Sequence, residues 1–239
     1  MTGRRLDGRI GACIAGWVGF VALVARCPAA AADPARHAYV VAAIGDSLTD
    51  PRSHGGIYLR DLQARCPESR FDSYGVGGQM VNQMHHRFAR DVLGEPPDPS
   101  KPHYTHVIVF GGVNDLYSDL TAGRTVEKIE SDLSAMYRAA HDQGIKVVAM
   151  TVTPWGGFHR YYNASRAATT AALNRWIVGQ QVTRAVDYAI DAYPLLSCGN
   201  PEELCESDAT PFKDGIHFGP AGHEKIAEAL YAQVFSDCR

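Results

Sequence analysis

Metal-binding cysteine patterns are missing from this sequence. None of its six cysteines stands in a Cys-x-x-Cys pair, the spacing common in structural zinc sites. The histidines at 85, 86, 103 and 106 have no companion carboxylate at ligand spacing. We therefore expect no metal site and no other cofactor.

Internal repeats, low-complexity tracts and dividing linkers are also lacking. The 239 residues fit one α/β domain. Because 46% of the residues are hydrophobic and 21% are charged, the composition is that of an ordinary globular protein. We expect a single domain.

The first 32 residues have the order of a secretory signal peptide. Three arginines within the first nine residues precede an uncharged stretch over residues 10–25, and small residues at 29–32 offer cleavage sites. We expect cleavage near Ala32 and a single secreted or periplasmic domain over residues 33–239. The alternatives are a retained membrane anchor, because the stretch is nearly long enough to span a bilayer, and a lipoprotein at Cys27, which Arg26 disfavours.

Basic residues are scarce in the mature chain. Removal of residues 1–32 takes away four of 23 basic and one of 26 acidic residues, which leaves a net charge of −6. No basic stripe remains to attract nucleic acid, and a mildly acidic surface does not favour anionic membranes. We expect no nucleic-acid partner and no stable membrane anchor.

Apolar, β-branched runs alternate with helical patterns throughout the mature region. Such runs are typical of a parallel sheet covered on both faces. The order predicts an α/β three-layer sandwich with right-handed crossovers, around a parallel sheet of about five strands in the flavodoxin-like order 2-1-3-4-5. The expected strands are 39–44, 70–74, 106–110, 146–152 and 185–190, and the expected helices are 57–65, 80–93, 125–143, 165–182 and 220–235.

Four cysteines remain after cleavage, and an even number in an exported chain favours two disulfides. Three pairings are possible. Cys198 and Cys205 bracket a short polar loop, which favours a local bridge. In the expected topology the first and last helices lie side by side with their carboxyl ends together, which favours a bridge between Cys66 and Cys238.

A serine follows the first expected strand in the hexapeptide Gly45-Asp46-Ser47-Leu48-Thr49-Asp50. This places Ser47 on a tight turn at the carboxyl edge of the sheet, where open α/β sheets bind ligands. A serine hydroxyl is a weak nucleophile without a base. Asp214 and His217, three residues apart just before the last helix, complete a candidate hydrolase triad. The alternative for Ser47 is a helix cap.

Four separated blocks of the sequence resemble, in order, those of a GDSL esterase of the SGNH hydrolase superfamily. Together they span nearly the whole mature chain. The blocks are Gly45-Asp46-Ser47-Leu48, Gly75-Val76-Gly77-Gly78, Gly111-Gly112-Val113-Asn114-Asp115 and Asp214-Gly215-Ile216-His217. One departure precedes the second block, where the family often has an asparagine and this chain has Ser73-Tyr74.

The resemblance implies a serine esterase. Ser47 would be the nucleophile, His217 the general base, and Asp214 the residue that orients the imidazole. The oxyanion hole would combine the backbone N–H groups of Ser47 and Gly78 with the side-chain amide of Asn114.

Several residues around these blocks have alternative or supporting roles. Gly77 is the alternative to Gly78 as the backbone donor. Asp46 and Asp50 flank the proposed nucleophile, and we expect both to brace the turn by accepting backbone N–H groups. His223 lies one turn into the last helix and is expected on the surface.

Aromatic residues follow the fourth expected strand and should therefore lie at the same edge of the sheet. We expect Trp155, Phe158 and Tyr161 to bind substrate as a wall for an acyl chain or a sugar ring. The alternative is a surface loop packed on its own aromatic rings. Arg52 and His54, after the nucleophile turn, are further candidates for the entrance.

These features predict a carboxylic-ester hydrolase that acts as a monomer on a small-molecule or polysaccharide ester. A carbohydrate O-acetylesterase, a lysophospholipase and a thioesterase are alternatives with the same machinery. An inactive binding module of the same fold is the non-enzyme alternative.

Overall fold

A five-stranded parallel sheet forms the centre of the protein. The computed structural model describes residues 37–238, and the expected signal peptide lies outside them. The sheet order β2-β1-β3-β4-β5 and the parallel pairing confirm the predicted α/β fold. The strands are β1 (Val40–Gly45), β2 (Arg70–Gly75), β3 (His106–Phe110), β4 (Lys146–Met150) and β5 (Tyr188–Ile190).

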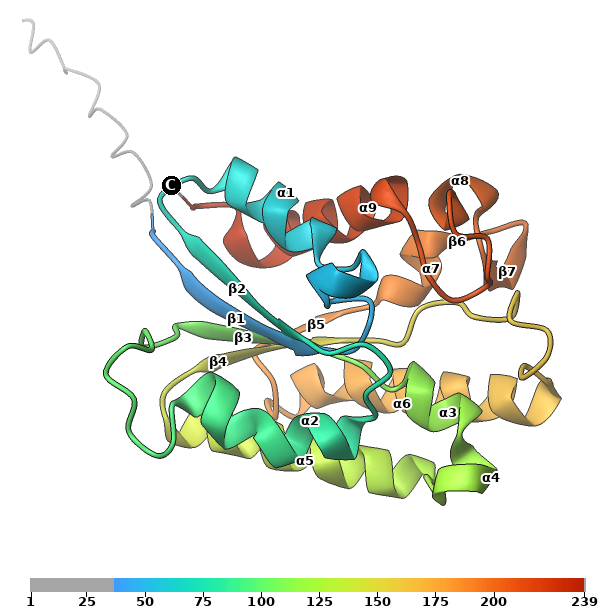
Figure 1. Ribbon diagram of the computed structural model, residues 1–239, viewed down its shortest axis with the longest axis horizontal. Coiled ribbons are helices and arrows are strands. Elements are labelled where there is room, and N and C mark those ends of the chain that lie inside the picture. Colours follow the sequence, from blue (N-terminus) through green and yellow to red (C-terminus); the bar gives the residue numbers. More distant parts are fainter. Residues whose placement is uncertain (1–36, 239) are drawn as a thin grey trace, which may run out of the picture. The chain divides into compact units, whose positions relative to one another are not determined.

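Helices cover both faces of this sheet (Figure 1). Alternate residues of a strand point to opposite faces, so Val107 and Val109 of β3 join one core and Ile108 and Phe110 join the other. One face carries α1 (Ile57–Arg65), α7 (Ala192–Leu196), α8 (Glu206–Ala209) and α9 (Pro220–Leu230). The other carries α2 (Val81–Phe88), α3 (Val113–Tyr117), α4 (Asp119–Ala122), α5 (Val126–Asp142) and α6 (Ala164–Val182).

The long helices lie close to their predicted bounds. Helix α1 has the predicted bounds, and α5 and α6 each begin one residue away from them. The helices expected over 80–93 and 220–235 each end in a π-helical turn, at Ala89–Leu93 and Tyr231–Phe235. The long apolar periodicities were therefore sufficient to place these elements.

Short elements were not predicted, because two to five residues are too few to reveal a period unless they form an apolar run. They include α3, α4, α7 and α8, and a hairpin of β6 (Ser197–Cys198) and β7 (Asn200–Leu204). Strands β4 and β5 are shorter than expected: β4 ends at Met150, and residues 185–187 form bends, so that β5 begins only at Tyr188. Within residues 37–238, none of the helices has the length and hydropathy of a membrane span.

Two disulfides connect the four cysteines of the described region. Cys66 at the end of α1 is bonded to Cys238, with 5.3 Å between their Cα atoms. Cys198 is bonded to Cys205 across the β6–β7 hairpin, with 5.2 Å between Cα atoms. This is the pairing that the adjacent first and last helices favoured.

His223 is buried, which corrects the expectation that it lies on the surface. It is 1% exposed, and its ring centroid lies 5.9 Å from that of Tyr58 and 4.5 Å from that of Phe218. His223 and Ile226 lie three residues apart on the buried face of α9. Burial, and to a smaller extent the charge of Arg60, lowers the pKa of His223 to about 3. The imidazole is therefore a neutral member of the core.

Removal of the Cys66–Cys238 bridge should cost more stability than removal of the Cys198–Cys205 bridge. The first joins residues 172 apart in sequence and the second joins residues 7 apart. The entropy of loop closure makes the expected difference in unfolding free energy about 3 kcal/mol. Denaturant unfolding of the two double alanine variants measures this difference, and equal losses would contradict it.

Substitution of His223→Phe should make stability less sensitive to acid. The unfolded chain binds a proton at His223 with a pKa near 6.5, whereas the folded value is about 3. Its contribution to stability is therefore full above pH 6.5 and is lost as the pH falls towards 3, by about 2 kcal/mol at pH 5. Melting curves of both proteins from pH 8 to pH 4 test this, and identical pH slopes would contradict it.

Candidate active site

The turn after β1 carries Ser47 and is braced by Asp46. The Asp46 Oδ1 atom accepts the backbone N–H of Leu48 at 2.9 Å, and its carbonyl oxygen accepts two N–H groups further along the turn. Burial raises the pKa of Asp46 to about 7, although the hydrogen bond from Leu48 opposes this. This is the bracing role expected for Asp46.

Asp50 ties this turn to the second sequence block. Its carboxylate accepts the backbone N–H of Arg52 at 2.9 Å and that of Gly77 at 3.0 Å. The Arg52 guanidinium also pairs with Asp50, at 3.0 Å. Although burial opposes it, these hydrogen bonds hold the pKa of Asp50 below its usual value. The Arg52 side chain therefore pairs with Asp50 in the turn, and it does not line the cavity described below.

Ser47, His217 and Asp214 form a continuous chain of hydrogen bonds. Ser47 Oγ lies 2.8 Å from His217 Nε2, and His217 Nδ1 lies 2.6 Å from Asp214 Oδ2. The other carboxylate oxygen, Oδ1, accepts the backbone N–H groups of Ile216 and His217 at 3.0 and 2.8 Å. Burial tends to raise the pKa of Asp214, but these bonds outweigh it and hold the pKa below its usual value. Asp214 is therefore anionic at neutral pH, as an orienting partner of imidazole must be.

The residues with the predicted oxyanion donors, Ser47, Gly78 and Asn114, line one cavity. Gly78 has φ +76°, a left-handed conformation that favours glycine. Within residues 37–238, neither the Ser47 N–H nor the Gly78 N–H donates a hydrogen bond to another group. The Gly77 N–H is already used by Asp50, which favours Gly78 over Gly77 as the donor.

Asn114 is held in place by its own amide. Its Nδ2 donates to the carbonyl oxygen of Gln79 at 2.9 Å and lies 3.3 Å from Asp46 Oδ2. Asn114 is 6% exposed and is the second residue of α3, which begins at Val113. The contact joins the third sequence block to Gln79, the residue that directly follows the second block.

Ser73 takes part in supporting the nucleophile turn. Its hydroxyl donates to the carbonyl oxygen of Thr49 at 2.7 Å. The Tyr74 hydroxyl instead lies 2.6 Å from that of Tyr104, away from the turn. The chain therefore keeps a hydrogen bond between β2 and the turn at the place where its sequence departs from the family pattern.

A cavity of about 590 Å³ opens beside these groups. It brings together Ser47, Gly78, Asn114, Asp214 and His217 from all four sequence blocks. Phe158 and His54 also line it, as the sequence suggested. Sequence reasoning missed four lining residues, which are Ser53, Tyr117, Phe212 and Ile216.

Trp155 does not line the cavity, which corrects its expected role in substrate binding. It is fully buried, and its Nε1 donates to Thr170 Oγ1 at 3.0 Å. Tyr161 packs on Phe158 and Tyr117, with ring centroids 4.7 and 5.7 Å apart, and so supports the wall from behind. The sequence does not show which aromatic residue of this segment packs in the core and which lines the cavity. That is decided by how the segment packs against the rest of the chain.

Residues 43–225 match the model of the GDSL-like lipase/acylhydrolase family. The chain belongs to this family. It is therefore an ester-hydrolysing enzyme, and the match includes all four sequence blocks. A comparison with curated proteins found no match.

Solved structures of other acylhydrolases share the fold of this GDSL-like acylhydrolase. A GDSL-like lipase from Bacteroides thetaiotaomicron is 20% identical with a TM-score of 0.64, over 81% of this chain and 86% of that one. A catalytic mutant of an acetylxylan esterase from Geobacillus stearothermophilus is 18% identical with a TM-score of 0.64, over 84% and 96%. At sequence identities of 18% and 20%, the similarity to these structures shows the fold alone.

Substitutions at Trp155 and Phe158 should separate stability from substrate binding. Trp155→Phe removes a buried hydrogen bond and should lower the unfolding free energy by about 1–3 kcal/mol, with KM for an ester substrate unchanged. Phe158→Ala removes part of the cavity wall and should raise KM several-fold. Steady-state kinetics and thermal melts of both variants measure this. A raised KM in Trp155→Phe, or an unchanged KM in Phe158→Ala, would contradict the placement of these rings.

Proposed function

We propose that this acylhydrolase is a serine carboxylic-ester hydrolase that works through an acyl-serine intermediate. The observation that carries the proposal is the chain of contacts from Ser47 through His217 to Asp214, at 2.8 and 2.6 Å. Ser47, at one end of this chain of hydrogen bonds, lines an open cavity that is large enough for an ester.

In the first step the Ser47 hydroxyl attacks the ester carbonyl carbon. His217 Nε2 accepts the hydroxyl proton, because its Nδ1–H is directed at Asp214 and leaves Nε2 free to act as a base. The carboxylate of Asp214 then stabilises the imidazolium. The alcohol leaves with a proton returned by His217, and the acyl group remains on Ser47.

The negative oxygen of the tetrahedral intermediate is stabilised by three donors. They are the N–H groups of Ser47 and Gly78 and the amide of Asn114, whose weak 3.3 Å contact with Asp46 is readily exchanged for an oxyanion. Loss of one such donor typically raises the barrier by about 3–4 kcal/mol.

Deacylation repeats the same proton transfers with water as the nucleophile. His217 removes a proton from the attacking water, and the carboxylic acid leaves as Ser47 regains its hydrogen. The two steps consume one water and release an alcohol and an acid, so no cofactor is required.

We also propose that the mature enzyme is one hydrolase domain of residues 33–239 in a secreted or periplasmic location. The signal-like order of residues 1–32 and the two disulfides support this, because disulfides persist in oxidising compartments.

A carbohydrate O-acetylesterase is the second candidate. The rings of Tyr117, Phe158 and Phe212 at the cavity suit the apolar face of a sugar, and one structure with this fold is an acetylxylan esterase. In this case the sugar would be the leaving alcohol.

Hydrolysis of p-nitrophenyl esters from acetate to palmitate tests the proposal. Ser47→Ala should lower turnover at least about 10³-fold because no acyl-serine can form, while folding and disulfides remain intact. Ser69→Ala is the matched control, since this buried serine lies just before β2 at the opposite edge of the sheet.

Activity of Ser47→Ala equal to that of the wild type would overturn the mechanism. Serine-dependent activity confined to acetate would favour the carbohydrate acetylesterase, and activity on longer chains would favour a general esterase. A folded protein that cleaves no ester would favour the binding module.

A further inference from the structure

Asp115, the residue after Asn114, is a fully buried carboxylate with two partners. Its Oδ2 accepts the backbone N–H of Val81, the first residue of α2, at 2.9 Å. Its Oδ1 accepts the Nε–H of Arg124 at 2.7 Å. Each oxygen of Asp115 therefore contacts a different segment of the chain.

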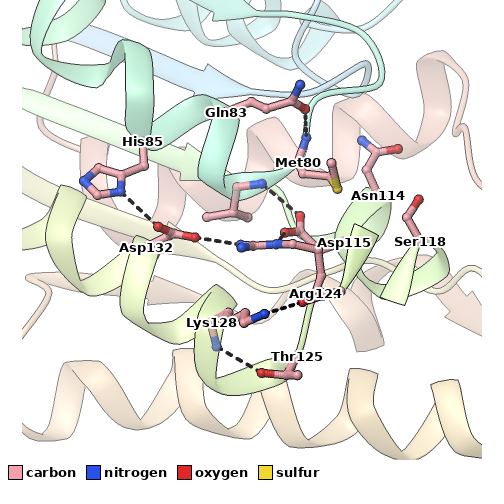
Figure 2. Close-up of polar contacts among 12 residues, drawn as sticks. Met80, Gln83, His85, Asn114, Asp115, Ser118, Arg124, Thr125, Lys128 and Asp132 are labelled. Atoms are coloured by element: carbon pink, nitrogen blue, oxygen red, sulfur yellow. Dashed lines mark hydrogen bonds and ion pairs between the residues drawn. The ribbon is translucent and has the colours of Figure 1, made fainter. Parts of the chain in front are cut away.

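Arg124 extends this contact to α5 and back to α2. Its side chain is 8% exposed, and its second nitrogen donates to Asp132 at 2.7 Å. The other oxygen of Asp132 lies 3.0 Å from His85 Nδ1 on α2. Figure 2 shows the contacts running from His85 through Asp132 and Arg124 to Asp115.

The network contacts both segments that carry the proposed oxyanion donors. Val81 follows Gly78 by three residues, and Asn114 directly precedes Asp115. The Asn114 amide is also bonded to the carbonyl oxygen of Gln79. The start of α3 and the segment before α2 are thus joined at two points, one of which is the Asp115 carboxylate.

An oxyanion hole requires such a connection, because its donors must approach one oxygen to within about 2.7–3.1 Å. The Gly78 N–H and the Asn114 amide come from different segments, so their separation depends on how α2 and α3 are held. Stability alone gives a weak reason for a buried ion pair, since apolar side chains of similar volume are often as stabilising.

We propose that Asp115 and Arg124 are positioning residues that set the separation between the Gly78 and Asn114 donors. This inference rests on the proposed oxyanion hole. Asp115 fixes the start of α2 relative to Asn114, and Arg124 fixes the orientation of the carboxylate. Neither Asp115 nor Arg124 is among the residues that line the cavity.

Substitution of Asp115→Asn tests the proposal. The variant should lower kcat by about 10–100-fold through misplaced donors, with KM little changed. Active sites are titrated with a fluorophosphonate, so that kcat refers to folded enzyme only. Asp187→Asn is the matched control, because Asp187 also accepts one backbone N–H and one side-chain nitrogen, at the amino end of β4. Its kcat should equal that of the wild type.

A double-mutant cycle with Asn114→Ala distinguishes positioning from general structural support. If Asp115 acts through the hole, its substitution should reduce kcat much less in the Asn114→Ala background, by under about 3-fold. Effects that multiply in full would overturn the proposal, as would a wild-type kcat for Asp115→Asn. If Asp115→Asn does not fold, Arg124→Lys, which keeps the charge with a single donor group, enters the same cycle. A wild-type kcat for Asn114→Ala would instead refute the proposed oxyanion hole itself.

Discussion

Parallel pairing of β1 with β2 and β3 is the constraint on which the rest of the structure depends. In register, Gly45 is aligned with Gly75 on one side and with Phe110 on the other. The three strands therefore end together, and the three sequence blocks that follow them meet at one edge of the sheet. The fourth block reaches that edge because it directly precedes α9, which packs beside α1 (Figure 1).

Buried polar side chains hold these blocks in place. Asp46, Asn114 and Asp115 are almost completely buried, and a buried polar group is costly unless it is hydrogen-bonded. Each bonds to the backbone: Asp46 within its own turn, and the other two to the segment just before and at the start of α2. In His223, by contrast, the Nδ1 atom has no partner among the described residues, and this side chain packs in the core without contacting the cavity. The buried polar side chains near the cavity therefore hold the site residues in position. The buried imidazole of His223 instead makes the stability of the fold depend on pH.

The fold could be predicted further than the site. Hydrophobic runs placed all five strands and five long helices, because burial on one or two faces leaves a period in the sequence. The residues that line the cavity show no comparable period in the sequence. Trp155 and Phe158 lie in one aromatic segment, yet one is buried against Thr170 and the other lines the cavity. Tyr117 was missed because α3 is too short to show a period, and Phe212 because it lies in an irregular loop.

The sequence by itself determined the α/β fold, the family blocks and the candidate nucleophile and base. These depend on local patterns, such as a glycine-rich turn after an apolar strand. Tertiary structure alone decided that, among the described residues, the Gly77 N–H has an acceptor while that of Gly78 has none. It also decided that His223 is buried and which aromatic rings face the cavity. Each depends on which segment packs against another, and residues such as Asp50 and Gly77, 27 positions apart, become neighbours only when the chain folds.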